Sequence, residues 1–168
     1  MARQFDEQVC VVTGGTQGIG WALVEAFAAG GAQVFACGRS AENLARAAAH
    51  CAARPWGAQI ALAQVDVTDE TALVAWLEDI VAQTGRLDVL VHNAAYVQWE
   101  DVVDMSIAQA QLTMRVAYDA LVVAVTTVLP RMLAAGSGRI VVMGSIAGEI
   151  FVGGQSAAYA GAKAALHA

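Results

Sequence analysis

The sequence contains little charge, and the charge it has is mainly acidic. Charged residues form 14% of the 168 residues, hydrophobic residues form 58%, and the formal net charge is −6. Domains that bind nucleic acid usually carry clustered Lys and Arg, and no such cluster occurs in this sequence. The composition argues against a nucleic-acid partner. It favours a layered α/β fold, in which the strands of a parallel sheet are buried on both faces.

Long apolar runs are absent as well. The longest lies around residues 120–129, is interrupted by Thr126 and Thr127, and is too short to cross a bilayer. Residues 1–7 lack the apolar segment of a secretory signal. We therefore expect no membrane segment and a cytoplasmic location.

Cysteine is scarce. Cys10, Cys37 and Cys51 are odd in number and lack the spacing of metal ligands, so no metal site is predicted. Cys10 and Cys37 fall within apolar strand patterns, where a free thiol packs as a small hydrophobic group. This usage fits a reducing compartment.

A strand pattern followed by a helix pattern repeats five times along the chain. The expected strands cover residues 9–13, 33–37, 60–65, 87–92 and 139–143, and the expected helices cover 21–29, 41–52, 68–84, 106–135 and a stretch starting near Ala157. Thr68 is expected to cap the third helix, and Pro130 to kink or break the fourth. This alternation predicts an α/β fold with a doubly wound, Rossmann-like parallel sheet and helices on both faces. Residues 1–168 are expected to form a single dinucleotide-binding domain.

A glycine-rich turn, Thr13-Gly-Gly-Thr-Gln-Gly-Ile-Gly20, joins the first strand to the first helix. Gly14 permits a tight turn, Gly18 lets a pyrophosphate approach the backbone, and Gly20 lets the helix pack closely. The helix N-terminus offers free amides and a favourable dipole to phosphates. An ordinary tight turn is the alternative explanation. The predicted phosphate-binding residues are Gly14, Thr16, Gln17, Gly18, Ile19 and Gly20.

A phenol and an ammonium group lie one helical turn apart near the end of the chain. Tyr159 and Lys163 share one face of the last helix. A free tyrosine has a pKa of about 10, and a nearby cation lowers it towards the neutral range where the phenol can transfer protons. Ser145, just after the fifth strand, can donate to a substrate oxygen. A half-buried Tyr beside a surface Lys is the alternative, but together with the glycine turn the pattern predicts nicotinamide-dependent hydride transfer.

The order of these motifs, and the glycine spacing Gly-x-x-x-Gly-x-Gly, resemble the short-chain dehydrogenase/reductase family. The resemblance implies that Ser145 orients the substrate, that Tyr159 is the acid or base, and that Lys163 binds the cofactor ribose and tunes Tyr159. It covers essentially the whole sequence. Because the sequence ends at Ala168, shortly after Lys163, the C-terminal part of the family's usual fold is expected to be absent.

The resemblance also assigns two segments at strand ends. Asp66 and Val67 match the family's adenine-contacting residues, although Asp66 can also belong to a helix-capping cluster. Asn93 and Ala94 match the middle of the family's Asn-Asn-Ala-Gly segment. His92 departs from that segment, and since no acid lies beside it in the sequence we interpret it as a packing residue rather than a catalyst.

The end of the second strand indicates the cofactor. An acid there would bond the adenosine ribose and repel a 2′-phosphate, but Gly38 occupies the position and Arg39, with a fork suited to phosphate, follows it. We expect NADP(H) in preference to NAD(H). Gln17 is neutral, so the second basic residue that some NADP-dependent members carry in the glycine turn is missing. The alternative for Arg39 is a solvated loop arginine.

Two further expectations concern the long helix. In many members of the family an asparagine there completes a proton relay with the lysine through water. Ala117 occupies that position, so the relay is absent or another group or water replaces it. The family pairs subunits through this helix, and a homo-oligomer, a dimer or tetramer, is expected. The apolar side chains expected to be exposed on it are Leu121, Val122, Val125 and Leu129.

The function predicted is an NADP(H)-dependent oxidoreductase that interconverts a secondary alcohol and a ketone, with Tyr159 moving the proton. An apolar or ring-bearing small-molecule substrate is favoured. The alternatives are a nucleotide-binding or subunit-pairing module without turnover, and a cofactor-retaining epimerase or dehydratase. The apolar and aromatic residues predicted to form the substrate wall are Tyr96, Val97, Trp99, Ile150, Phe151 and Val152.

Overall fold

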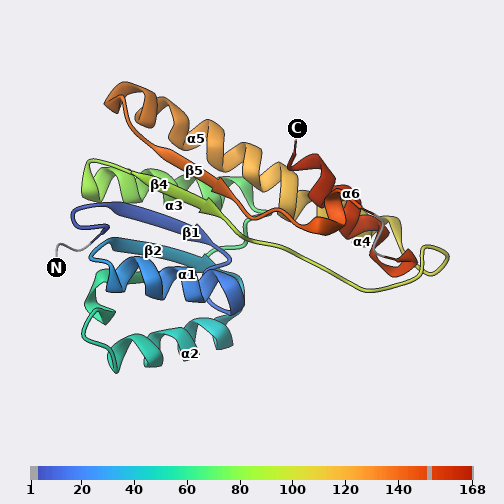
Figure 1. Ribbon diagram of the computed structural model, residues 1–168, viewed down its shortest axis with the longest axis horizontal. Coiled ribbons are helices and arrows are strands. Elements are labelled where there is room, and N and C mark those ends of the chain that lie inside the picture. Colours follow the sequence, from blue (N-terminus) through green and yellow to red (C-terminus); the bar gives the residue numbers. More distant parts are fainter. Residues whose placement is uncertain (1–3, 151–152, 168) are drawn as a thin grey trace.

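Five parallel strands form the centre of the fold in the computed structural model, which describes residues 4–150 and 153–167 (Figure 1). The strands are β1 (Val9–Thr13), β2 (Gln33–Gly38), β3 (Ile60–Gln64), β4 (Val89–His92) and β5 (Arg139–Val142). Their order in the sheet is β3-β2-β1-β4-β5. The chain runs outward from β1 to β3 and then crosses to the other side of β1, so the carboxyl ends of β1 and β4 flank a topological switch point. The predicted doubly wound parallel sheet is confirmed.

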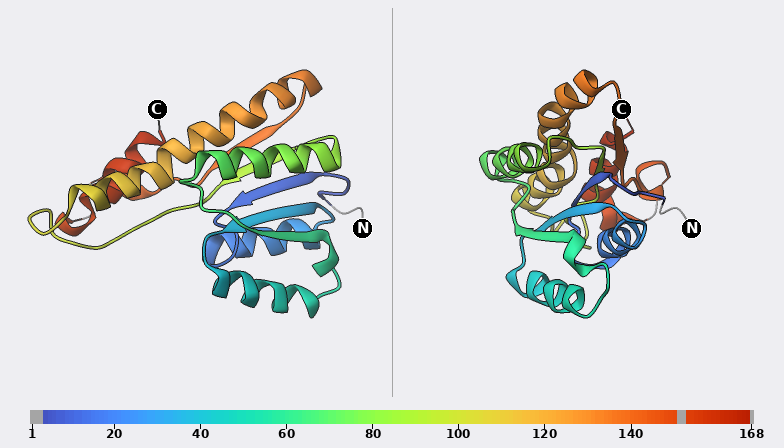
Figure 2. Two further views of the ribbon diagram at one scale, coloured as in Figure 1. Left: turned by 180° about the vertical axis from the view of Figure 1, so that it is seen from behind. Right: turned by 90° about the vertical axis from the view of Figure 1, so that its left-hand side faces the viewer.

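Helices cover both faces of this sheet (Figure 2). The helix α1 (Gly18–Ala29) packs on one face, and α2 (Ala41–Ala52) packs beside it, where the rings of Trp21 and His50 meet edge to face. On the opposite face lie α3 (Glu70–Thr84) and α5 (Ala120–Ala135).

The strands are apolar on both sides because each side faces a helix layer. Along β1, Cys10 and Val12 pack with Val24 of α1, whereas Val11 packs with Leu73 of α3. Successive side chains of a strand point to opposite faces, so two helix layers require apolar residues at every position. This explains the high hydrophobic content of the chain.

The long apolar helix is irregular at a place before Pro130 that was not predicted. It consists of α4 (Ile107–Met114), one π-helical turn at Arg115–Asp119, and α5. Pro130 lies inside α5 and does not end it, so the prediction of a break there is wrong. The prediction that Thr68 caps α3 is also wrong. Asp69 is the cap, and its side chain accepts a hydrogen bond from the amide of Ala72 at 3.0 Å.

The 29-residue segment Ile107–Ala135 passes the length and hydropathy test of a membrane span, because an 18-residue window within it has a mean hydropathy of 1.6. Ala120, Ala124 and Val128 recur at one-turn spacing on it and are buried in the core. Core helices of globular domains commonly pass the same test. On its other side Val122 and Leu129 are exposed as predicted, whereas Leu121 and Val125 are half-buried.

Beyond the carboxyl ends of the strands, an arm extends away from the sheet (Figures 1 and 2). It contains α4 and α6 (Ala157–Ala165), the loop after β4, and the short 3₁₀ turns η3 (Ile146–Gly148) and η4 (Gly154–Ser156). The helix α6 packs against η3 and α4. The arm places the last helix over the same sheet edge that carries the glycine turn.

Replacement of Leu73 by Ala tests the core. Leu73 is fully buried, and truncating such a side chain costs about 2–5 kcal/mol of the free energy of unfolding. The control is Leu133→Ala, at a side chain that is 71% exposed, and its effect should stay within about 0.5 kcal/mol. Urea denaturation followed by circular dichroism measures both, and equal losses would contradict the assignment of this core.

Candidate functional site

Three glycines of the turn have no room for a side chain: Gly15, whose Cβ would lie 2.8 Å from Cβ of Ala36, and Gly14 and Gly20, which face β4. Gly14 has a φ of +63°, and a Cβ on it would lie 2.8 Å from Cα of Ala94. A Cβ on Gly20 would lie 2.3 Å from the carbonyl oxygen of Gly14 and 2.4 Å from Nδ2 of Asn93. Gly18, with a φ of +56°, meets none of the described residues within 4 Å of such a Cβ. The turn is thus closed towards β4 and open above Gly18.

Asn93 and Thr13 bind the ends of β4 and β1 together. The Asn93 amide Nδ2 donates to the carbonyl oxygens of Thr13, at 3.2 Å, and Gly14, at 3.0 Å. The Thr13 hydroxyl accepts from the backbone amides of Asn93 and Ala94, at 3.1 and 3.2 Å. These bonds fix the turn against β4, and both side chains stand at the switch point where ligands of such sheets bind.

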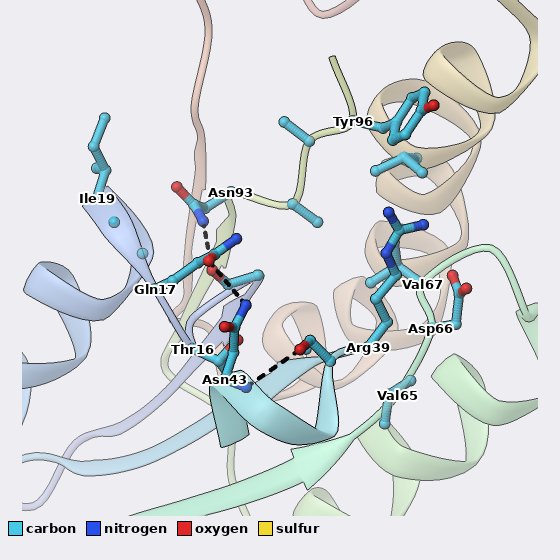
Figure 3. Close-up of a pocket in the computed structure, with 18 residues that line it drawn as sticks. Thr16, Gln17, Ile19, Arg39, Asn43, Val65, Asp66, Val67, Asn93 and Tyr96 are labelled. Carbon is cyan, nitrogen blue, oxygen red and sulfur yellow. Dashed lines mark hydrogen bonds between the residues drawn. The ribbon is translucent and has the colours of Figure 1, made fainter. Parts of the chain in front are cut away.

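A cavity of about 580 Å³ opens above the turn (Figure 3). Every residue predicted to bind the cofactor lines this cavity except Lys163. Several residues that were not predicted to bind the cofactor line it as well. Its volume lies in the usual range of small-molecule and cofactor sites. The residues predicted and found in its wall are Gly14, Thr16, Gln17, Gly18, Ile19, Gly20, Arg39, Asp66, Val67, Asn93 and Ala94, and the additional ones are Gly38, Ser40, Asn43, Val65, Ala95, Tyr96 and Val116.

Charge at one end of the cavity comes from Arg39 and Asp66 (Figure 3). Burial alone would raise the pKa of Asp66, but hydrogen bonds from Thr68 and the charges of Arg39 and Arg115 outweigh burial and lower it. The carboxylate is therefore ionised at neutral pH. The Arg39 guanidinium carbon lies 5.6 Å from the centre of the Tyr96 ring, so one face of the cation meets an aromatic ring.

The three residues predicted for catalysis lie outside this cavity, on adjoining elements of the arm. Ser145 caps η3, and its Oγ accepts from the amide of Ala147 at 3.2 Å, which leaves its proton free to donate. Tyr159 and Lys163 lie on α6, with Nζ of Lys163 5.8 Å from the centre of the Tyr159 ring. A Cβ on Gly148 would lie 2.7 Å from the carbonyl carbon of Lys163, so η3 and α6 touch backbone to backbone.

Lys163 is buried, with only 4% of its surface exposed, so it is not the surface lysine of the alternative explanation. Its Nζ donates to the carbonyl oxygen of Met143. Burial lowers the pKa of Lys163 from its ordinary value. The amide of Met143 in turn donates to the carbonyl oxygen of His92 at 2.9 Å, which connects the ammonium to the end of β4, next to Asn93.

His92 is buried, with 1% exposure, and both of its ring nitrogens have partners. Nδ1 lies 3.3 Å from Oγ1 of Thr13, and Nε2 lies 2.8 Å from the carbonyl oxygen of Ala117 in the π-helical turn. Because the Thr13 oxygen already accepts two amide protons, its own proton goes to Nδ1, and Nε2 donates to Ala117. This agrees with the interpretation of His92 as a packing residue.

Most of the predicted apolar substrate wall is exposed in the described residues. Val97, Trp99 and Ile150 are exposed, and the Trp99 ring lies 5.9 Å from the Tyr159 ring. Tyr96 lines the cofactor cavity instead, against Arg39. Phe151 and Val152 lie outside the described residues.

The buried imidazole predicts a pH dependence of stability. Burial, and to a lesser degree the charge of Lys163, lowers the pKa of His92 to about 4, against about 6.5 in an unfolded chain. Between these values the unfolded state binds more protons, so stability rises with pH. The contribution is complete above about pH 6.5 and is lost as the pH falls to about 4.

Between about pH 7 and pH 5 we expect protonation of His92 to lower the free energy of unfolding of the wild type by about 2 kcal/mol. In His92→Gln this contribution to the change of stability with pH should be missing. Urea denaturation at both pH values measures it. The matched control His167→Gln leaves His92 intact and should keep the slope. An unchanged slope in His92→Gln would contradict the assignment.

Comparison with known proteins gives the family. The short chain dehydrogenase family model matches residues 8–168. The 3-oxoacyl-[acyl-carrier-protein] reductase FabG of Escherichia coli K12 is 31% identical over 173 residues, covering 96% of this chain and 64% of that protein. The cis-4-hydroxycyclohexanecarboxylate dehydrogenase of Sinomonas cyclohexanicum is 34% identical over 169 residues, covering 98% of this chain and 65% of the relative.

Solved structures agree with this result. A metagenomic short-chain oxidoreductase in complex with NADP has a TM-score of 0.86 at 29% identity, covering 97% of this chain and 73% of the other. A short-chain dehydrogenase from Streptomyces avermitilis has a TM-score of 0.84 at 30% identity, and the match covers 95% of this chain and 57% of the other. The chain spans between 50% and 65% of the length of the curated relatives described by these matches. It belongs to the short-chain dehydrogenase/reductase family.

Proposed function

We propose that this chain carries the cofactor site and the catalytic residues of an NADP(H)-dependent oxidoreductase that interconverts a secondary alcohol and a ketone. The observation that carries the proposal is the cavity above the glycine turn, together with the buried Lys163 beside Tyr159 at the same sheet edge. The names of the relatives support the reaction class, since one reduces a 3-oxoacyl group and another is a dehydrogenase of a hydroxylated ring.

The residues present fit a dinucleotide. Gly14 and Gly20 carry no side chain where the turn meets β4, so the turn lies close to the end of that strand. The space above Gly18 is open, and there the backbone amides at the start of α1 can bind a pyrophosphate. Asp66 and Val67 would hold the adenosine end, and Asn93, Ala94 and Lys163 the nicotinamide end. When bound, the nicotinamide would supply or accept the hydride.

The preference for NADP(H) is supported by the end of β2. A Cβ on Gly38 would lie 2.4 Å from Oγ1 of the buried Thr16, so an acid at this position could fit only if Thr16 moved. No carboxylate therefore stands at the end of β2 to repel a 2′-phosphate, and Arg39 extends into the cavity instead. A similar structure at 29% identity is a complex with NADP.

Proton transfer would be carried by Tyr159. In the direction of reduction, its phenol would give a proton to the carbonyl oxygen, and Ser145 would donate a hydrogen bond to the same oxygen. Lys163 would stabilise the phenolate that results. Its ammonium is buried with a neutral carbonyl partner, so its charge acts on the Tyr159 ring with little screening by water.

We further propose an apolar or ring-bearing small-molecule substrate, supported by the exposed Trp99, whose ring lies 5.9 Å from the Tyr159 ring. Exposed Val122 and Leu129 on the long helix support a homo-oligomer. The free, buried cysteines support a cytoplasmic location.

A second candidate is a nucleotide-binding module without turnover. The observation that favours it is Ala117, which offers no polar side chain at its own position of the π-helical turn and whose carbonyl oxygen is already bonded to His92. The first experiment below separates it from the oxidoreductase.

Replacing Tyr159 by Phe should abolish turnover while leaving NADPH affinity within about twofold, because only the proton donor is removed. The expected loss in kcat is about 10²–10⁴-fold for a panel of cyclic and aromatic ketones. NADPH fluorescence measures both binding and consumption. A wild type that binds NADPH but reduces no ketone would favour the binding module, and full turnover by Tyr159→Phe would overturn the mechanism.

Replacing Gly148 by Ala should separate η3 from α6, because the new methyl group would meet the backbone of Lys163. We expect kcat to fall by at least about 10-fold with NADPH affinity retained, since misplacing reacting groups by an ångström can cost 10²-fold. The matched control is Gly161→Ala, whose Cβ would meet none of the described residues within 4 Å. Equal kinetics of the two variants would show that this contact does not position Ser145.

A further inference from the structure

We propose that Arg46 of α2 is a second cation for the 2′-phosphate of NADP(H), acting together with Arg39, and that Asn43 and Gln17 hold it at the rim of the cavity. The inference rests on the proposed preference for NADP(H). It concerns a residue that does not line the cavity and that no sequence motif indicated.

A chain of side-chain hydrogen bonds connects Arg46 to the glycine turn. Asn43 lines the cavity, and its Nδ2 donates to Oε1 of Gln17 at 2.8 Å (Figure 3). The other side of the same amide, Oδ1, accepts from Nη2 of Arg46, which follows Asn43 by one helical turn. The guanidinium is thus held one side chain away from position 17, where some members of the family carry a basic residue.

The cavity lining carries no net formal charge. Of the described residues that line it, Arg39 and Asp66 alone carry formal charge, one of each sign. A phosphate monoester carries about −1.5 to −2 charges at pH 7, so a second cation would favour its binding. Within the described part of the chain, no carboxylate lies within 4.0 Å of the Arg46 guanidinium, so its charge is available.

The start of α2 adds neutral donors between the two arginines. Ser40 caps the helix, and its Oγ accepts from the amide of Asn43 at 3.2 Å, so its own proton can be donated to an anion. The free amides and the dipole of this 12-residue helix favour negative charge at the same place. Glu42, exposed in the first turn and one turn before Arg46, opposes this charge and is the one acid in that turn.

The test compares NADPH, NADH and adenosine 2′,5′-bisphosphate by fluorescence and calorimetric titration, so it does not depend on turnover. Arg46→Gln should weaken the binding of NADPH and of the bisphosphate about 3- to 10-fold and leave the affinity for NADH within about twofold, as expected for one charged hydrogen bond of an exposed side chain. Glu42→Gln should tighten NADPH. The control Arg54→Gln, just beyond the C-terminal end of α2, where the arginine donates to His50, should change nothing.

Asn43→Ala supplies a second arm, because it removes the amide that holds Arg46 but keeps both arginines. It should reproduce part of the NADPH loss. Equal weakening of NADPH and NADH by Arg46→Gln would show a purely structural role, and an unchanged NADPH affinity would show that Arg46 makes no contact. Either result overturns this inference alone. A wild type that prefers NADH, or binds neither nucleotide, would overturn the proposed cofactor and the inference with it.

Discussion

The amide of Asn93 is the contact on which the rest of the site depends. It holds two carbonyl oxygens of the glycine turn, and it does so in space that is available only because Gly20 lacks a side chain. At this point β1 leads into the glycine turn and α1, whereas β4 leads into the loop before α4. The Asn93 bonds fix the turn on its β4 side, and the amide of Gly15, which donates to the carbonyl oxygen of Cys37 at 2.9 Å, fixes it on its β2 side. Thr13 completes the contact by accepting two amides from the β4 side.

His92 extends this contact to the catalytic side. Its imidazole joins Thr13 to the π-helical turn, and its backbone carbonyl accepts from Met143, whose own carbonyl receives the ammonium of Lys163. Because the ring is buried, it stays neutral and does not add a second positive charge near Lys163. A residue that carries no step of the proposed reaction therefore touches both halves of the site.

Sequence reasoning predicted the sheet well because periodicity and glycine positions are local signals. The strands, the helix starting at Ala157 and the residues around Gly18 follow directly from them. The π-helical turn was missed because it depends on the partner of the Ala117 carbonyl, and that partner lies 25 residues earlier in the chain. A proline in the sequence was the stronger local signal, yet the helix tolerates Pro130.

Contacts between helices, strands and loops that lie far apart in the sequence were the other part of the site that could not be predicted. The placement of Tyr96 against Arg39, and of Asn43 between Gln17 and Arg46, depends on how α2 and the loop after β4 face the turn. The burial of Lys163 also needed the packing of α6 on η3, since helix spacing alone fits a surface lysine equally well. Val116 lines the cavity, but in the sequence it is one apolar residue among many in a long helix, so nothing there indicates a contact with a cofactor.

Lys163 is the only lysine in this sequence, and it is buried. Reagents that attack side-chain amines therefore find no competing target on the surface, and isotope labelling of lysine gives a single resonance. With ¹⁵N placed at lysine Nζ alone, the one signal comes from the ammonium beside Tyr159, so the electrostatic state of the site can be followed without other lysine signals. Because this sequence has a single lysine, a lysine-specific label reports on this site alone.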